Sequence, residues 1–216
     1  MSYLLGIDIG TTSARAVIIE KSGSLVASAS KDYPLITPQP GWTEQNPREW
    51  WDATLFAIKK VLSSSDIDPH KLECIGLTGQ MHGSVFLDKE GQVIRPAILW
   101  NDQRTFKQCE RIYEIFGYRE FIKLAHNKAL PGFTATKIMW LEENEPDNFK
   151  KIYKVLLPKD YIRYKLSSKF ITDVSDASGT ILLDVENRRW SDQILEGLCI
   201  DRNMLPELCV HRFLLE

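Results

Sequence analysis

The chain has 216 residues, of which 44% are hydrophobic and 26% are charged, a composition typical of a soluble globular protein with a hydrophobic core. Its net charge of -2 at pH 7 argues against a broad basic surface for nucleic acid or anionic membranes, so we expect a small-molecule partner. The four cysteines form no C-x-x-C pair, the four histidines lack metal-ligand spacing, and no apolar run reaches the roughly 18 residues of a membrane span, which together predict a cytoplasmic protein with reduced thiols.

Two apolar runs, residues 3–9 and 14–19, open the chain and predict the strands of a β-hairpin, because they are rich in β-branched residues and only a short polar stretch separates them. Asp8 lies inside the first run. A carboxylate buried there must be paired, hydrogen-bonded or held against a cation.

The predicted turn, residues 10–13, reads Gly-Thr-Thr-Ser. Gly10 permits positive φ, and the following Thr11, Thr12 and Ser13 supply backbone amides and hydroxyls that suit phosphate oxygens. Asp8 beside such a turn is a candidate Mg²⁺ residue, since Mg²⁺ is usually held by one or two carboxylates and the phosphates of a substrate. The alternative is an ordinary hairpin with a polar turn, and this stretch alone does not decide between the two.

A third strand is predicted over residues 24–33, and a helix follows the loop after it. Asn46 as N-cap, Pro47 at the first helical position and Glu49 two residues later predict the helix start, and we expect it to end near Ser63. Apolar residues at helical spacing predict the face that packs on the core: Trp51, Leu55, Ile58 and Leu62. With the next strand at residues 71–78, the order β-β-β-α-β is typical of a ribonuclease-H-like unit, although a generic α/β domain also shows it.

The loop at residues 79–83, Gly-Gln-Met-His-Gly, follows a strand end, where ligands commonly bind in α/β proteins. Its glycines allow sharp bends, Gln80 and His82 offer hydrogen bonds, and Met81 can pack on an apolar ligand edge. The competing interpretation is that His82 is a surface or capping residue.

The strand predicted over residues 97–102 runs at its end into a second candidate loop, which contains Trp100, Asn101, Asp102 and Arg104. The alternative role for Asn101 or Asp102 is to cap the N-terminus of a helix predicted over residues 103–116. The two roles are compatible.

The rest of the chain predicts scaffold within a single α/β domain, residues 1–216. We expect these elements: helices at 134–143 and 158–166, a buried strand at 155–157, a polar loop at 175–180, and short helices at 192–198 and 203–208.

Seven separated motifs, in this order, resemble the FGGY carbohydrate kinases, and the resemblance extends from Tyr3 to about Trp190. The motifs are G-I-D-I-G-T-T-S (6–13), G-W-T-E-Q-N-P (41–47), G-Q-M-H-G (79–83), P-A-I-L-W-N-D-Q-R-T (96–105), P-G-F-T-A-T-K (131–137), L-P-K-D-Y-I-R (157–163) and S-D-A-S-G-T (175–180). Within the family, the M-H-G and W-N-D-x-R combination is most similar to members that phosphorylate D-xylulose.

The resemblance implies an actin/hexokinase-type fold of two ribonuclease-H-like domains, each a mixed sheet with flanking helices, that bind ATP, Mg²⁺ and a sugar in the cleft between them. It implies that this chain is the N-terminal domain, and that the C-terminal domain carries the proton-accepting aspartate in a G-D-N-type motif that is not found here. The chain's partners would then be the sugar and its own C-terminal domain. Assembly into a homodimer remains open.

Individual roles are carried over by position. Asp8 matches the carboxylate near Mg²⁺ and the γ-phosphate, and residues 10–13 match the phosphate hairpin. The positions matching the sugar-binding groups are Met81, His82, Trp100, Asn101 and Asp102. The chain departs from the family pattern at Ala125-His126 and at residues 134–137, which the resemblance places near the sugar.

The resemblance implies phosphorylation of D-xylulose to D-xylulose 5-phosphate. Two alternatives remain: a kinase of ribulose, gluconate or glycerol, or a non-catalytic sugar-binding regulator with the same fold. An intact Asp8 and hairpin argue against the regulator, because a sensor has no need of a Mg²⁺ carboxylate.

Overall fold

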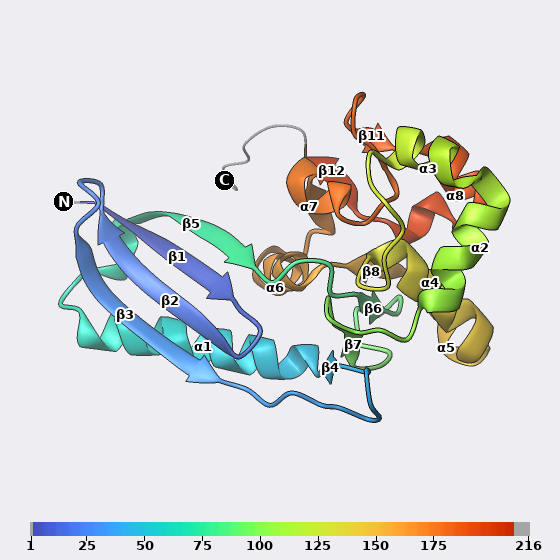
Figure 1. Ribbon diagram of the computed structural model, residues 1–216. Helices are drawn as coiled ribbons and strands as arrows, with labels where there is room; N and C mark the ends of the chain where they lie inside the picture. Colours follow the sequence, from blue (N-terminus) through green and yellow to red (C-terminus); the bar gives the residue numbers. More distant parts are fainter. Residues whose placement is uncertain (1, 210–216) are drawn as a thin grey trace.

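The computed structural model describes residues 2–209. Its first part is a four-stranded sheet with the order β3-β2-β1-β5 (Figure 1). The strands are β1 (Tyr3–Ile9), β2 (Ser13–Glu20), β3 (Leu25–Asp32) and β5 (Leu72–Gly79). β1 and β2 form the predicted antiparallel hairpin, whereas β1 and β5 are parallel, so Ile9 and Gly79 lie side by side at the same edge of the sheet. The predicted β-β-β-α-β order is therefore confirmed.

Helix α1 (Pro47–Ser64) packs against one face of this sheet. The predicted helix start is confirmed, because Pro47 is the first helical residue and the Asn46 side chain accepts a hydrogen bond from the Arg48 amide. The predicted core face is wrong by one position. Apart from Pro47 at its start, the buried residues of α1 are Trp50, Ala53, Thr54, Ala57 and Val61, while Trp51, Leu55, Ile58 and Leu62 are only partly buried.

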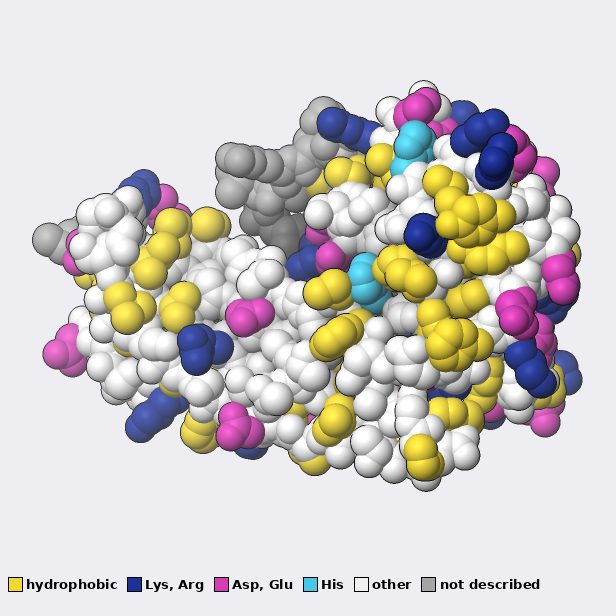
Figure 2. All heavy atoms as spheres, viewed as in Figure 1, with side chains coloured by type: hydrophobic (Ala, Val, Ile, Leu, Met, Phe, Trp, Pro, Cys, Tyr) yellow, Lys and Arg dark blue, Asp and Glu magenta, His cyan; other side chains and the backbone are white. Residues whose placement is uncertain are grey.

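The opposite face of the sheet is uncovered among the described residues, and alternate strand positions decide which side chains lie on it. In β1, Leu5, Ile7 and Ile9 are buried beneath α1, whereas Asp8 points the other way and is exposed. Asp8 is thus not a buried carboxylate, although it stands in an apolar run. It lines a hollow of about 360 Å³ with residues of β1, β2 and β5, including Arg15 and Thr78. Figure 2 shows hydrophobic side chains over this part of the molecule.

The second part of the chain contains helices and short two-stranded sheets with a separate hydrophobic core (Figure 1). The single turn η1 (Pro69–Lys71) still belongs to the first part, between α1 and β5. The elements after β5 are β6 (Val85–Leu87), β7 (Ala97–Ile98), α2 (Phe106–Phe116), α3 (Tyr118–Ala125), α4 (Thr134–Asn144), α5 (Pro146–Phe149), β8 (Lys154–Leu156), α6 (Pro158–Ser167), β9 (Ile171–Asp173), α7 (Val174–Ser178), β10 (Leu183–Asp184), β11 (Arg189–Trp190), α8 (Asp192–Gly197), η2 (Arg202–Met204) and β12 (Glu207–Cys209). Of these, β6, β7, β8 and α6 also supply side chains to the core beneath the sheet. Strand β4 (Glu44–Gln45) pairs with β7, and β6 pairs with β8.

Three predicted elements differ from the structure. The strand expected over residues 97–102 ends at Ile98, because the chain then turns back to bind the loop before α1. The helix expected over residues 203–208 is instead the single turn η2 followed by β12, which pairs with β9. The polar loop expected at residues 175–180 is largely helix α7. Within residues 2–209, no helix combines the length and apolar character needed to cross a membrane.

Candidate active site

The turn of the first hairpin, residues 10–13, has donors available for an anion. In the described part of the chain, the amides of Thr11 and Thr12 have no hydrogen-bond partner, whereas the neighbouring carbonyls are all used. The Tyr33 hydroxyl donates to the Gly10 carbonyl, and burial together with the charge of Asp8 raises the pKa of Tyr33, so this donor remains protonated. Gly10 does not have positive φ, contrary to the prediction. Its small size matters instead, because a Cβ there would lie 3.3 Å from the Ser13 carbonyl oxygen.

The Asp8 carboxylate forms no hydrogen bond or ion pair with any residue in the range 2–209. It is exposed near the end of β1, one residue before Ile9 and the hairpin turn. An unpaired carboxylate beside free amides and threonine hydroxyls has the donor set that a phosphate group and its Mg²⁺ require. The residues present therefore fit such a group.

The loop at residues 79–83 begins directly beside the hairpin, since the Gln80 amide donates to the Ile9 carbonyl at 2.7 Å. At its centre, His82 has a φ of 60°, and the Gly83 amide donates to the Met81 carbonyl at 2.7 Å. This is a γ-turn with a non-glycine residue in the left-handed region, a conformation that costs about 1–3 kcal/mol and persists only where surrounding contacts fix it. The two flanking glycines do not have positive φ, so the sharp bend expected of them lies at His82 instead.

Close packing explains those glycines. A Cβ at Gly79 would lie 3.0 Å from the Ile9 carbonyl oxygen, and one at Gly83 would lie 2.7 Å from Cγ of Pro158. Met81 by contrast is 52% exposed and is free to contact a ligand.

The His82 ring is half-buried and packs edge-on against Phe133, with 4.7 Å between the ring centroids. Burial, with a further contribution from Lys137, lowers the pKa of His82 to about 4. The ring is therefore neutral near pH 7. Its Nδ1 is buried against Gly179, which leaves Nε2 as the nitrogen that would bind a ligand hydroxyl.

This pKa predicts an acid-dependent loss of stability. In the unfolded chain, His82 takes up a proton near the usual histidine pKa of about 6.5. In the folded protein it does so only near pH 4. The free energy of unfolding should hence fall as the pH drops from about 6.5 to about 4. Asparagine tolerates the left-handed region, so H82N should lose less stability over this interval than the parent in urea titrations. The exposed control H70N should behave as the parent does, and equal slopes in all three proteins would contradict the pKa.

Trp100 connects the third segment of the site to the hairpin. Its Nε1 donates to the Thr11 hydroxyl at 3.2 Å, and 40% of its side chain stays exposed. The next residue, Asn101, is partly buried, and its Oδ1 accepts from the Thr43 hydroxyl at 2.8 Å. Trp100 thus presents an indole surface beside the hairpin turn.

The structure does not support direct contact between Asp102 and a sugar, because this side chain is completely buried. One carboxylate oxygen accepts from the Thr43 amide at 2.7 Å, and both accept from the Arg104 guanidinium, at 2.9 and 2.7 Å. The predicted capping role is also wrong, since α2 begins four residues later, after Thr105. Asp102 instead fixes the loop that carries Trp100 and Asn101.

Sequence reasoning missed two residues that join these segments. Gln45 is 1% exposed, its Nε2 donates to the Thr11 carbonyl at 2.7 Å, and its Oε1 accepts from Gln80 and from the Trp50 indole, both at 3.0 Å. Thr43 binds Asn101 and Asp102 as described above. The available signal was the polar Thr-Glu-Gln triplet before the N-cap residue Asn46, of which the structure buries Glu44 and Gln45 and leaves Thr43 partly buried.

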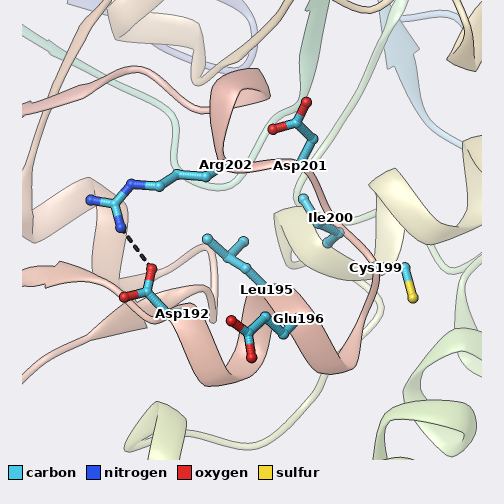
Figure 3. A pocket seen from close by; sticks show the side chains of 7 residues that line it. All are labelled: Asp192, Leu195, Glu196, Cys199, Ile200, Asp201 and Arg202. Carbon is cyan, nitrogen blue, oxygen red and sulfur yellow. Dashed lines mark hydrogen bonds and ion pairs between the residues drawn. The ribbon is translucent and has the colours of Figure 1, made fainter.

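The hairpin, the loop at 79–83 and the loop at 100–102 therefore meet at one edge of the sheet, where β1 and β5 both end. The arrangement provides free amides, the Asp8 carboxylate and two exposed side chains, Met81 and Trp100. A separate pocket of about 360 Å³ lies at α8 and η2, and the ion pair of Asp192 and Arg202 forms part of its lining (Figure 3). It contains none of the predicted site residues.

Known carbohydrate kinases resemble this chain in sequence and in fold. Residues 3–211 match the model of the N-terminal domain of the FGGY family of carbohydrate kinases. The chain is 44% identical to the xylulose kinase of Staphylococcus xylosus and 41% identical to that of Bacillus subtilis, in each case over 96% of this chain and 43% or 42% of the relative. The solved structure of the xylulose kinase from Rhodospirillum rubrum has a TM-score of 0.91 and 26% identity, covering 96% of this chain and 42% of that one.

The chain spans less than half the length of the relatives it matches. The matched kinase structures establish the actin/hexokinase-like fold expected from the sequence. With the family model covering nearly all of its residues, the chain belongs to the FGGY family of carbohydrate kinases.

Proposed function

We propose that this chain is the N-terminal domain of a two-domain, cytoplasmic kinase that transfers the γ-phosphoryl group of ATP to D-xylulose. The observation that carries the proposal is the meeting of the phosphate-type hairpin with the loops at 79–83 and 100–102 at one sheet edge. The choice of sugar is supported by the xylulose kinases among its relatives.

Phosphoryl transfer depends on positioning the nucleophile and neutralising phosphate charge more than on covalent chemistry by the protein. In the turn at residues 10–13, the free amides of Thr11 and Thr12 would bind phosphate oxygens, and Asp8 would hold Mg²⁺. The metal, when bound, neutralises charge on the phosphates. Asp8 is suited to this role because its carboxylate has no competing partner in the described chain.

The sugar would lie between Met81, His82, Trp100 and Asn101, with its primary hydroxyl toward the γ-phosphate. The hydroxyl oxygen attacks phosphorus, the bond from phosphorus to the bridging oxygen breaks, and ADP leaves. The hydroxyl proton goes to an aspartate of the C-terminal domain. Neutral His82 would bind a sugar hydroxyl, while Asp102 would act only through the loop it fixes.

Kinases of ribulose, gluconate or glycerol are the competing candidates within the family, and a non-catalytic sugar-binding regulator is the candidate outside catalysis. The free Asp8 carboxylate and hairpin amides favour the kinase, since a regulator that only binds sugar gains nothing from a Mg²⁺ and phosphate site.

A substrate panel on the two-domain protein tests the proposal. We expect D-xylulose to give a higher kcat/KM than ribulose, gluconate or glycerol in an ADP-release assay. H82A should raise the KM for xylulose by about 10-fold or more, because a pocket built to bind hydroxyls loses a hydrogen bond there, while the KM for ATP stays near the parent value. The proposal fails if no sugar is phosphorylated, or if H82A affects ATP alone.

A further inference from the structure

We propose that Lys137 and Gly179 are positioning residues that hold the strained loop at 79–83 in its sugar-binding conformation, and so set the affinity for the ketose. The inference rests on the proposed function and adds two residues to it. Both lie outside the loop and far from it in sequence.

Lys137 is on α4 and is 0% exposed. Its Nζ donates a hydrogen bond to the His82 carbonyl at 2.6 Å, and within residues 2–209 Nζ has no other hydrogen-bond partner. Burying an amine is costly. Burial is the largest effect on the pKa of Lys137, and with the Arg104 cation it outweighs the opposing attraction of Asp102, so this pKa lies well below its usual range. Lys137 binds the carbonyl of His82, the residue with φ of 60°, and so stabilises the γ-turn. The burial of its amine destabilises the core in return.

Gly179, which is far from His82 in the sequence, packs directly against the His82 ring. A Cβ at Gly179 would lie 2.4 Å from Cε1 and 2.6 Å from Nδ1 of that ring, so no larger residue fits without moving it. The φ of Gly179 is -73°, which any residue can adopt, and the glycine is therefore needed for contact and not for backbone conformation. The ring is held between Gly179 and Phe133.

Helix α7, which precedes Gly179, is itself fixed in place. The Lys159 ammonium binds Asp173 at 2.7 Å and Asp176 at 3.0 Å, and it also binds the buried Asp160 at 2.7 Å. These three carboxylates could hold a metal ion by spacing alone, but the lysine already occupies the position between them. Because α7 is tied to α6 in this way, Gly179 is a rigid wall for the ring.

The test uses the two-domain protein and the variants K137M and G179A. We expect each to raise the KM for D-xylulose by at least about 10-fold, since small misplacements of a binding group have large effects, with the KM for ATP within about 2-fold of the parent and kcat changed less than KM. K137M should leave Tm close to the parent value, because the desolvation cost of the buried amine that it removes offsets the loss of the donor to the His82 carbonyl. If the lysine had only a structural role, K137M would lower Tm.

K154M is the matched control. Lys154 also donates to backbone carbonyls, those of Asn203 and Leu205 at 2.6 and 3.0 Å, but it lies on β8 and touches no residue of the candidate site. It should leave the KM for xylulose unchanged. Parent-like xylulose KM in K137M and G179A would overturn the inference, as would a parallel rise in both KM values with a fall in Tm. A parent protein that phosphorylates no sugar would instead reject the proposed function, and the inference with it.

Discussion

The variant D8N of the two-domain protein is expected to lower kcat by about 10²- to 10³-fold, the cost of removing one electrostatic contact from a phosphoryl-transfer site, while leaving the KM for sugar and Tm close to the parent values. The physical reason is the isolation of Asp8. Its carboxylate is exposed and unpaired in the described chain, so asparagine removes a charge opposite the metal without breaking any contact of the fold.

The measurement is steady-state ADP release at saturating xylulose and several Mg²⁺ concentrations, with thermal unfolding as the check on the fold. D66N is the control, because Asp66 is an exposed aspartate after α1 and makes no contact with the site. Turnover by D8N close to that of the parent would show that Asp8 has no part in phosphoryl transfer. A loss shared by D66N would show that the effect is general and not specific to the site.

Residues 1–216 alone are expected not to phosphorylate any sugar. General-base catalysis contributes about 10² to 10⁴ in rate, and in the proposed kinase that base belongs to the C-terminal domain. The same domain would complete the nucleotide site, and poor alignment of the γ-phosphate costs further orders of magnitude. The combined loss should therefore exceed the contribution of the base.

ADP release with D-xylulose, measured side by side on residues 1–216 and on the two-domain protein, checks this prediction. Circular dichroism of the shorter chain verifies that it is folded. Weak sugar binding through Met81, His82, Trp100 and Asn101 is expected to persist, since all four belong to this chain. Comparable turnover in the two proteins would mean that a base exists within residues 1–216, and the two-domain mechanism would be wrong.

Local signals explain why part of the fold could be predicted. The β1-β2 hairpin follows from two apolar runs around a polar turn, and the start of α1 follows from Asn46 and Pro47, whose effects extend over only a few residues. The buried face of α1 could not be read in the same way. Trp50 and Trp51 each begin a series at helical spacing, and only the sheet packed on α1 decides between them.

The candidate site shows the same division. The loops at 79–83 and 100–102 could be located from their position after strand ends, but whether a polar side chain faces a ligand or the interior depends on distant parts of the chain. Asp102 is buried because Thr43 and Arg104 satisfy its carboxylate. Lys137 lies in a helix whose sequence gives no sign that its amine reaches a carbonyl 55 residues earlier.

The buried Gln45 amide ties the hairpin turn to Gln80, and Trp100 ties the third loop to that same turn. In the proposed kinase, the groups that bind the phosphoryl donor and those that bind its acceptor would then form one rigid block. Closure of a second domain would bring its base and the nucleotide to this block, with the acceptor already aligned. The free energy of closure would be used for excluding water, and not for arranging the sugar.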